Sequence, residues 1–436
     1  MCMKIDTHTQ LKNRKFSGEK ELKLACNLTE FPKEIFELCD TLEVLDLTDN
    51  NLSALPDNFD TFKKLKILFL SNNQFKEVPK VLAKCPSLTM IGFRNNQIHT
   101  LAEDALPLTT RWLILTDNHL KTLPNSIGKL TYLQKCMLSG NELTTLPKTF
   151  SQCKNLELLR IAANQLRTFP TELLDLPKLS WLAYGGNPFC DKHPSCATPL
   201  QEITWDNITI KEKLGEGASG TIFKAIYEGK EVALKVFKGD MTSDGLPQEE
   251  MDINIAMGKH TNLIDVLARV TKHPDAKDVL MLELISASFF NLGLPPTLES
   301  CSRDVYPEGF SLTLEQSIKI LQGLASAAVH MHSRGIMHGD FYAHNIMIDK
   351  DANPILGDFG GASYFMPSAI KIRHALECLE VRAFGYLIEE MLMLSQKDKY
   401  TQDKRDKLIA LKEQCLTKKN AKRPLFAKIH QIMLAL

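Results

Sequence analysis

Hydrophobic residues in the first half of the chain recur at one fixed spacing. The order Leu42, Leu45, Leu47, Asn50, Leu52 returns as Leu65, Leu68, Leu70, Asn73, Phe75 and again as Leu88, Ile91, Phe93, Asn96, Ile98. Further asparagines in phase are Asn118, Asn141, Asn164 and Asn187, so each unit is 22 or 23 residues long. Self-similarity at such a period predicts an array of stacked units, each of which buries its apolar side against its neighbours.

Within each unit, alternate leucines are expected to point inward from a short strand, while the Asn side chain satisfies backbone groups of the following turn. A proline pair follows the Asn by five residues, as in Leu55-Pro56, Val78-Pro79, Leu123-Pro124, Leu146-Pro147 and Phe169-Pro170. Proline there would end the turn and start the segment on the outer face. These units resemble leucine-rich repeats, and the resemblance implies a curved α/β solenoid.

The two ends of the array differ from its middle, because a terminal repeat has no neighbour to cover it. Residues 19–38 look like a degenerate first unit, and residues 187–190 look like a closing unit. We therefore predict a repeat domain over residues 19–199. Cys190 and Cys196 are close enough for a disulfide. The absence of a signal-peptide-like N-terminus favours free thiols instead.

The strand positions expected to face solvent mix charges with aromatic rings. They include Glu43, Asp46, Lys66, Phe69, Lys135, Glu157, Arg160 and Trp181. Such a mixture suits contact with a protein more than contact with a phosphate backbone. We expect a protein partner on this face, although an ordinary polar surface would explain each residue taken singly.

Composition excludes several classes of function. The chain has 52 basic and 52 acidic residues, so its net charge predicts no binding of nucleic acid. No segment reaches the apolar length of a membrane span. Eleven scattered cysteines, an odd number, indicate a reducing compartment, and we expect a cytoplasmic location.

The second half carries candidate chemistry in residues 337–361. His338-Gly339-Asp340, then Asn345, then Asp358-Phe359-Gly360 resemble the catalytic and metal loops of protein kinases. The resemblance implies that Asp340 orients the attacking hydroxyl and accepts its proton, while Asn345 and Asp358 hold Mg²⁺ against ATP. In that family the His supports the loop, so we expect a structural role for His338.

The approach to this segment completes the resemblance. Strand-rich runs flank Gly215, Gly217 and Gly220, and this strand–turn–strand context favours the kinase glycine loop over a dinucleotide-binding turn. Glycines would let backbone amides lie close to the phosphates. Lys235, in the sequence Val-Ala-Leu-Lys, would meet the α- and β-phosphates. Adenine is expected between Ile222 and Ala233 on one face and Met347 on the other.

A helix between these motifs should supply a carboxylate for Lys235. Glu250 shares a helical face with Ile253 and Met257, so we predict Glu250, with Glu249 as the second choice. Counting backward from His260 would place Met251 there instead.

The run Val279–Ile285 looks like the kinase hinge. Leu282 would be the gatekeeper, and the backbone of Glu283 and Ile285 would hydrogen-bond adenine. The resemblance covers residues 205–436 and implies a two-lobed α+β kinase domain. The whole chain is thus predicted to be a multidomain protein, a solenoid followed by this domain.

Several residues depart from the kinase pattern. Gly339 replaces the Arg that pairs with a phosphorylated activation loop in regulated kinases, so we expect no such switch. Tyr342 stands where Ser/Thr kinases carry a Lys, for which His344 or another cation would have to substitute. The loop Ser286–Phe310 is too long for a plain connection and is expected to shape the substrate cleft.

The activation segment is also short. Met366–Ser368 stands where Ala-Pro-Glu is expected, which leaves little chain for docking a peptide and removes the usual Glu partner of Arg423. Glu377 is a candidate replacement. Ser363 and Tyr364 could be modified, although buried or solvated loop positions are the simpler interpretation.

Together these patterns predict an ATP- and Mg²⁺-dependent protein kinase, with Ser/Thr acceptors favoured over Tyr, whose repeats recruit a substrate or partner. Two alternatives remain open at this point. One is a pseudokinase scaffold in which the repeats are the functional part. The other is a small-molecule kinase, since choline and aminoglycoside phosphotransferases share the His-Gly-Asp motif with an Asn five residues beyond the Asp.

Overall fold

The computed structural model describes residues 3–5, 18–190, 200–239, 241–365, 370–396 and 399–436. It divides into two compact units. The first, the repeat unit, comprises Met1–Lys178 and Asn187–Phe189. The second, the catalytic unit, comprises Leu179–Gly186 and Cys190–Leu436.

Short parallel strands form the sheet of the repeat unit, one from each repeat. They are β1 (Met3–Ile5), β2 (Glu21–Leu24), β3 (Val44–Asp46), β4 (Ile67–Phe69), β5 (Met90–Gly92), β6 (Trp112–Ile114), β7 (Lys135–Met137) and β8 (Leu158–Arg160). Each pairs with the next in an unbroken register, such as Leu45 with Leu68 and Leu68 with Ile91. From β2 to β8 the central residue of each strand is fully buried, which confirms the predicted solenoid; these residues are Leu22, Leu45, Leu68, Ile91, Leu113, Cys136 and Leu159.

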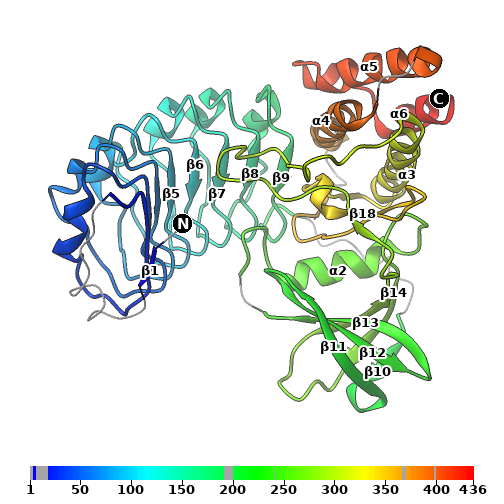
Figure 1. Cartoon of the computed structure of the whole chain (residues 1–436), viewed down its shortest axis with the longest axis horizontal. Helices are drawn as coiled ribbons and strands as arrows, with labels where there is room; N and C mark the ends of the chain where they lie inside the picture. The colour runs from blue at the N-terminus through cyan, green and yellow to red at the C-terminus, as the bar shows by residue number, and fades with distance from the viewer. Residues whose placement is uncertain (1–2, 6–17, 191–199, 240, 366–369, 397–398) are drawn as a thin grey trace. The chain divides into compact units, whose positions relative to one another are not determined.

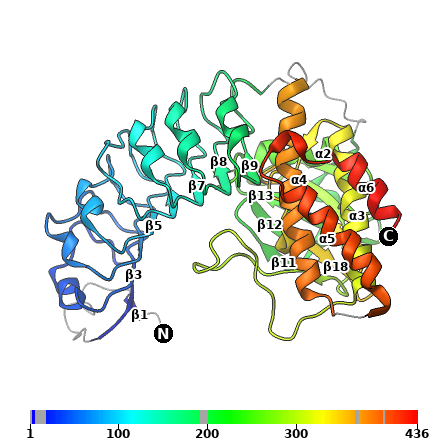
Figure 2. The same cartoon turned by 90° about the horizontal axis from the view of Figure 1, so that it is seen from above.

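Short 3₁₀ helices connect the strands and lie along the other side of the stack, as Figure 2 shows. They are η1 (Lys33–Leu38), η2 (Phe59–Thr61), η3 (Lys80–Lys84), η4 (Asn125–Lys129), η5 (Lys148–Gln152) and η6 (Thr171–Asp175). In five of them a proline directly precedes the first residue, and η2 follows Asn58 instead. Proline therefore starts the outer segment in most repeats, as predicted.

The repeated asparagines form a buried ladder. The Asn73 amide donates to the Leu47 carbonyl oxygen at 2.9 Å, and its own oxygen accepts from the Leu52 amide at 2.9 Å. Both partners belong to the preceding repeat. Equivalent bonds are made by Asn50, Asn96, Asn118, Asn141, Asn164 and Asn187. The asparagines are structural, because they satisfy backbone groups that would otherwise be buried without partners.

The expectation of a solvated strand face is wrong for half of the positions named for it. Lys135, Glu157, Arg160 and Trp181 are at most 8% exposed. The side chain of Lys135 packs against Trp112 of the neighbouring strand, with its Nζ 4.3 Å from the ring centroid. Its aliphatic stem therefore covers apolar surface of that ring. The surroundings of Trp181 are described below.

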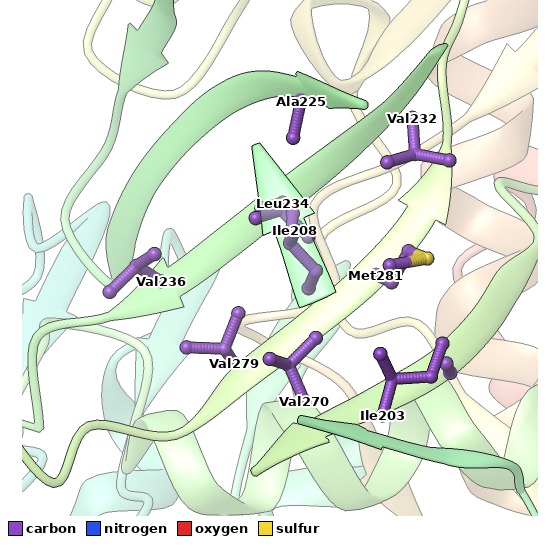
Figure 3. Packing of buried hydrophobic residues seen from close by; sticks show 10 residues of the cluster. Ile203, Ile208, Ala225, Val232, Leu234, Val236, Val270, Val279 and Met281 are labelled. Atoms are coloured by element: carbon purple, nitrogen blue, oxygen red, sulfur yellow. The ribbon is translucent and has the colours of Figure 1, made fainter. Parts of the chain in front are cut away.

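A six-stranded sheet opens the catalytic unit, in the order β10-β14-β15-β13-β12-β11. The strands are β10 (Glu202–Thr204), β11 (Ile208–Glu216), β12 (Gly220–Tyr227), β13 (Lys230–Phe237), β14 (Val266–Thr271) and β15 (Val279–Glu283), with η7 (Trp205–Asn207) before β11 and α2 (Pro247–Met257) after β13. On one face, Val232, Leu234 and Val236 pack with Val279 and Met281 (Figure 3). Alternation along β13 therefore turns Ala233 and Lys235 to the opposite face.

Four long helices form the second part of the catalytic unit, apart from the sheet and α2 in Figure 1. They are α3 (Leu314–Ser333), α4 (Ile370–Leu394), α5 (Gln402–Leu416) and α6 (Phe426–Leu434), with η9 (Lys399–Thr401) and η10 (Asn420–Lys422) between the last three. The short strand β16 (Phe290–Asn291) precedes α3. The loops between α3 and α4 contain the short elements β17 (Ile336–Met337), η8 (Ala343–Asn345), β18 (Ile346–Ile348), β19 (Pro354–Leu356) and β20 (Ser363–Tyr364). This is the predicted two-lobed α+β architecture. Within the described ranges, none of the helices combines the length and apolarity needed to span a bilayer.

Candidate active site

The glycine-rich turn between β11 and β12 has two kinds of glycine. A Cβ on Gly220 would lie 2.6 Å from the Val236 carbonyl oxygen, so that glycine is required by packing. A Cβ on Gly215 or Gly217 would meet no heavy atom within 4 Å. The turn itself is held by the Gly217 amide, which donates to the Gly220 carbonyl at 2.9 Å. This open backbone near residues 215–217 fits the approach of phosphate groups.

Lys235 and Glu250 form an ion pair between β13 and α2. Their side chains are 15% and 2% exposed, so the pair is shielded from solvent. Of the three helix residues considered from the sequence, Met251 is fully buried in an apolar cluster with Ala233 and Leu282. Burial and then the charge of the nearby Asp252 raise the pKa of Glu249. The structure thus brings Glu250 to Lys235.

Most residues predicted to surround adenine lie near one another. Ala233 is directly opposite Leu282 across the β13–β15 ladder, and Ile222 packs against the same cluster. The Glu283 amide donates to the Asp265 carbonyl at 2.9 Å, so this N–H is not the group that would meet adenine. Ile285 is half-buried just beyond β15.

Met347 occupies a different place from the Ala233 cluster. It is half-buried on β18, which pairs with β16 and β19. Its predicted place on the second face of adenine stays a prediction.

The loop of residues 338–345, here termed the catalytic loop, is tied together by its own side chains. The Asn345 amide donates to the Asp340 carbonyl at 2.9 Å and to its Oδ2 at 3.0 Å. His338 is fully buried, and its Nε2 donates to the Gly357 carbonyl at 3.0 Å while its Nδ1 accepts from the Asp340 amide at 3.2 Å. His338 therefore supports the loop from within the core, as predicted.

Asp358 lies in an environment that favours a bound cation. Its backbone has a φ of 53°, and burial followed by the Glu250 carboxylate raises its pKa more than Lys235 lowers it. Asn345 lies beside this segment, because its backbone carbonyl accepts from the Gly357 amide at 2.9 Å. The Asn345 side-chain oxygen and the Asp358 carboxylate are hard oxygens of the kind Mg²⁺ prefers. Over the described ranges there is no cluster of three or more His, Cys, Asp or Glu side chains that could hold a metal. Bound Mg²⁺ would therefore need phosphate and water ligands as well.

The catalytic loop is also supported by Glu380 and His332, two residues for which the sequence did not predict this role. Glu380 on α4 accepts from the Gly339 amide at 2.8 Å and pairs with His332 Nε2 at 2.5 Å. Burial lowers the pKa of His332, but the carboxylates of Glu377 and Glu380 outweigh it and raise the pKa to about 9. The available signal was Glu380 itself, at the helix position where kinases usually carry Asp.

The long loop between residues 286 and 310 also packs on the catalytic loop. The Tyr342 hydroxyl donates to the Ser302 carbonyl at 3.0 Å, and the Asp304 carboxylate accepts from the His344 backbone amide at 2.9 Å. His344 Nδ1 lies 2.7 Å from the same carboxylate. Burial lowers the pKa of His344, but its contact with Asp304 raises it overall. Only the length of the insertion signalled this contact.

The predicted pairing of Arg423 with Glu377 is wrong. Arg423 donates to the carbonyl oxygens of Cys378 and Thr417 at 2.8 and 3.0 Å. Glu377 instead accepts from the Phe426 amide and lies 3.5 Å from His332 Nδ1. Backbone carbonyls thus take the place of a carboxylate for Arg423. Met366–Ser368 lies outside the described residues.

Comparison with known proteins gives the same division of the chain. The protein kinase domain family matches residues 208–403, and the leucine rich repeat family matches residues 20–75, 40–98 and 109–166.

Curated relatives match the second half. The proto-oncogene serine/threonine-protein kinase mos of Sus scrofa is 29% identical over 183 residues, 40% of this chain and 52% of that protein. Serine/threonine-protein kinase mos of Gallus gallus is 25% identical over 167 residues, 36% of this chain and 48% of that protein. Probable serine/threonine-protein kinase SIS8 of Arabidopsis thaliana is 24% identical over 228 residues, 48% of this chain and 20% of that protein. The chain spans about half of the mos proteins and a fifth of SIS8. Within this chain, residues that match leucine rich repeats thus precede residues that match the protein kinase domain.

Proposed function

We propose that this chain is an ATP-dependent protein kinase that phosphorylates Ser or Thr in protein substrates. The observation that carries the proposal is the assembly around the catalytic loop. Lys235 is paired with Glu250, Asn345 is bonded to Asp340, and desolvation followed by the like charge of Glu250 raises the pKa of Asp358. Carboxylates held near one another in this way resist ionisation unless a cation compensates their charge. Bound Mg²⁺ would supply that compensation.

In this proposal the residues of the site divide the work of phosphoryl transfer. Asp340 orients the acceptor hydroxyl and takes its proton, and the Asn345 amide fixes the Asp340 carboxylate for that step. Lys235 binds the α- and β-phosphates and is itself oriented by Glu250. Asn345 and Asp358 would hold Mg²⁺, which neutralises charge on the triphosphate.

The adenine site is proposed from the same strands. Ile222, Ala233 and Leu282 would form its apolar wall, with Met347 opposite and the backbone of Glu283 and Ile285 bonding the base. The glycines at 215, 217 and 220 would cover the phosphates.

We further propose that the repeat domain, residues 19–199, recruits a protein substrate or partner to the kinase domain, residues 205–436. Strand positions that stay accessible to solvent, such as Glu43, Lys66 and Phe69, mix charges with an aromatic ring, which suits a protein better than nucleic acid. A cytoplasmic location is supported by the thiols, which are free at Cys39, Cys85, Cys136, Cys153, Cys378 and Cys415.

A scaffold without transferase activity is the second candidate, because Tyr342 stands in the place of a phosphate-neutralising Lys. Its ring is 5% exposed and packed, so it brings no cation to the transferring group. Such a scaffold would bind Mg²⁺ and ATP without consuming the nucleotide. A small-molecule kinase would consume it with soluble alcohols and no protein acceptor.

The test is transfer of the labelled γ-phosphoryl from ATP to a generic protein acceptor in the presence of Mg²⁺. The purified full chain is compared with Asp358→Ala and with Asp351→Ala, a matched variant at an exposed turn position. We expect Asp358→Ala to lower transfer at least about 100-fold and Asp351→Ala to leave it unchanged. Phosphoamino-acid analysis then separates Ser/Thr from Tyr.

Other outcomes select the alternatives. Labelling of choline-like or sugar alcohols without labelling of protein would favour the small-molecule kinase. Binding of Mg²⁺-ATP by the wild type without any turnover would favour the scaffold.

A further inference from the structure

Residues 179–186, here termed the brace segment, belong to the last repeat by sequence and to the catalytic unit by packing. Leu179, Leu182 and Asn187 continue the repeat pattern. The strand β9 (Trp181–Ala183) occupies the same place in its repeat sequence as the strands of the earlier repeats. Yet residues 179–186 group with the catalytic unit. Their side chains contact the catalytic loop, β20 and α4.

Trp181 stacks on two tyrosines of the catalytic unit. It is 2% exposed, and its ring stacks on Tyr342 of the catalytic loop with centroids 4.3 Å apart and planes 7° apart. It also stacks on Tyr386 of α4, with centroids 5.6 Å apart and planes 17° apart. Its indole N–H donates to the Phe341 carbonyl oxygen at 3.3 Å. Trp181 therefore fixes both the backbone and a ring of the loop that carries Asp340.

The next residues of the brace segment bind the start of the activation segment. The backbone amides of Tyr184 and Gly185 donate to Ser363 Oγ at 3.3 and 3.1 Å, and the Tyr184 hydroxyl donates to the Tyr364 carbonyl at 3.0 Å. Ser363 is 1% exposed, and β20 pairs with β17 directly before the catalytic loop. The brace segment thus contacts the catalytic loop directly after Asp340, and it contacts β20, which pairs with the strand before Asp340.

Gly339 makes this close approach possible. It has a φ of 72°, and a Cβ there would lie 2.7 Å from the Leu182 carbonyl oxygen and 2.3 Å from that of Gly361. An Arg at this position would occupy the space that the brace segment and residue 361 fill. The residue that departs from the kinase pattern is therefore the one that admits β9.

We propose that the brace segment positions the catalytic loop for phosphoryl transfer, and that Trp181 is the positioning residue through which it acts. This inference rests on the proposed kinase function. In regulated kinases an Arg beside the catalytic Asp pairs with a phosphorylated activation loop. Here neutral contacts of Trp181, Tyr184 and Gly185 hold the same two segments, so positioning needs no phosphate group.

The experiment compares kcat and the KM for ATP in the full chain. Trp181→Ala removes both stacks and the indole N–H, and Trp181→Phe keeps an aromatic ring. Trp112→Ala is the matched control, because Trp112 begins strand β6 as Trp181 begins β9 but lies in the repeat unit.

We expect Trp181→Ala to lower kcat at least about 10-fold and to change the KM for ATP less than about 2-fold, since Lys235 and the glycine turn are untouched. Trp181→Phe should recover kcat to within about 3-fold of the wild type, because most of the stacking is restored. Trp112→Ala should leave both parameters unchanged. Unchanged or raised kcat in folded Trp181→Ala would overturn the proposal.

A second measurement keeps the proposal testable if Trp181→Ala does not fold, or if the wild type transfers no phosphate at all. Tyr184→Phe removes a single hydroxyl and keeps its buried ring. Hydrogen exchange at the Gly339 and Asp340 amides should be at least about 10-fold faster in Tyr184→Phe than in Trp112→Phe. Equal exchange rates would refute the brace. An inactive wild type with faster exchange in Tyr184→Phe would refute only the kinase function.

Discussion

Gly339 gives the sharpest test of the geometry around the catalytic loop, because two separate costs meet at one residue. Its φ of 72° lies in the left-handed region, where any side chain costs about 1 kcal/mol relative to glycine. A Cβ would also overlap two backbone carbonyl oxygens, those of Leu182 at 2.7 Å and Gly361 at 2.3 Å. Neither oxygen is the end of a flexible side chain, so the backbone must shift. Overpacking of this kind costs about 1–3 kcal/mol.

We therefore expect Gly339→Ala to destabilise the catalytic unit by about 3 kcal/mol. Gly229→Ala is the matched control. Gly229 has a φ of 76° in the turn between β12 and β13, but a Cβ there would meet nothing within 4 Å. That variant should lose only the conformational contribution, about 1 kcal/mol. The difference between the two variants measures the overlap with the carbonyl oxygens.

Urea unfolding followed by tryptophan fluorescence measures both variants. The chain has three tryptophans, and a Trp112→Phe background leaves Trp181 and Trp205, which both belong to the catalytic unit. If Gly339→Ala costs no more than Gly229→Ala, the Leu182 and Gly361 carbonyls do not crowd residue 339 and the packing of β9 described above is wrong. Gly339→Arg, which restores the usual kinase residue, should be at least as unstable as Gly339→Ala and less active than the wild type.

Two further predictions concern buried polar groups. Asn141→Ala leaves the buried Leu120 amide without its acceptor, while the carbonyls of Leu115 and Leu138 keep donors from Asn118 and Asn164. It should therefore destabilise the repeat unit by about 2 kcal/mol in urea unfolding, while the exposed Gln97→Ala should cost less than about 0.5 kcal/mol. Equal losses would show that the ladder is not structural. The pKa of His332 is about 9 in the folded chain, against 6.5 for an unperturbed His in the unfolded chain. The pairing of protonated His332 with Glu377 and Glu380 therefore contributes fully to the free energy of unfolding below pH 6.5, and this contribution is lost as the pH rises through about 9. The free energy of unfolding should fall by about 3 kcal/mol more over that range in the wild type than in His332→Gln, and parallel pH profiles would contradict this pairing.

The repeat architecture could be predicted from the sequence because the same order of hydrophobic residues, Asn and Pro recurs in successive units. The leucines, the Asn and the proline act within one repeat or between neighbours, so their spacing alone fixes their environment. The short outer segments gave no such signal about helix type. Each runs for six residues or fewer, and all but η2 follow a proline directly, so they are too short for a periodic pattern to separate 3₁₀ from α geometry.

The local part of the candidate site could also be predicted. Asn345 follows Asp340 by five residues, and this spacing alone brings the amide to the carboxylate. Contacts between distant segments could not be predicted. Trp181 was expected on a solvated strand face because alternation describes an isolated sheet, and its partner Phe341 is 160 residues away. The choice of Glu377 as the partner of Arg423 failed for the same reason, since only the packing of α4 shows that His332 is closer.

Three departures from the kinase pattern have a common physical explanation in these distant contacts. Gly339 leaves room for the Leu182 carbonyl, Tyr342 offers a ring for Trp181 to stack on, and the start of the short activation segment at Ser363 accepts hydrogen bonds from the brace segment. The long loop of residues 286–310 also contacts this cluster of rings. The guanidinium of Arg303 lies 4.2 Å from the ring centroid of Tyr386, on which Trp181 also stacks. An Arg at 339 or a Lys at 342 would remove one contact each and place a cation among packed rings and backbone carbonyls. The unusual features are therefore consistent with one another, because each of them makes a contact with the brace segment.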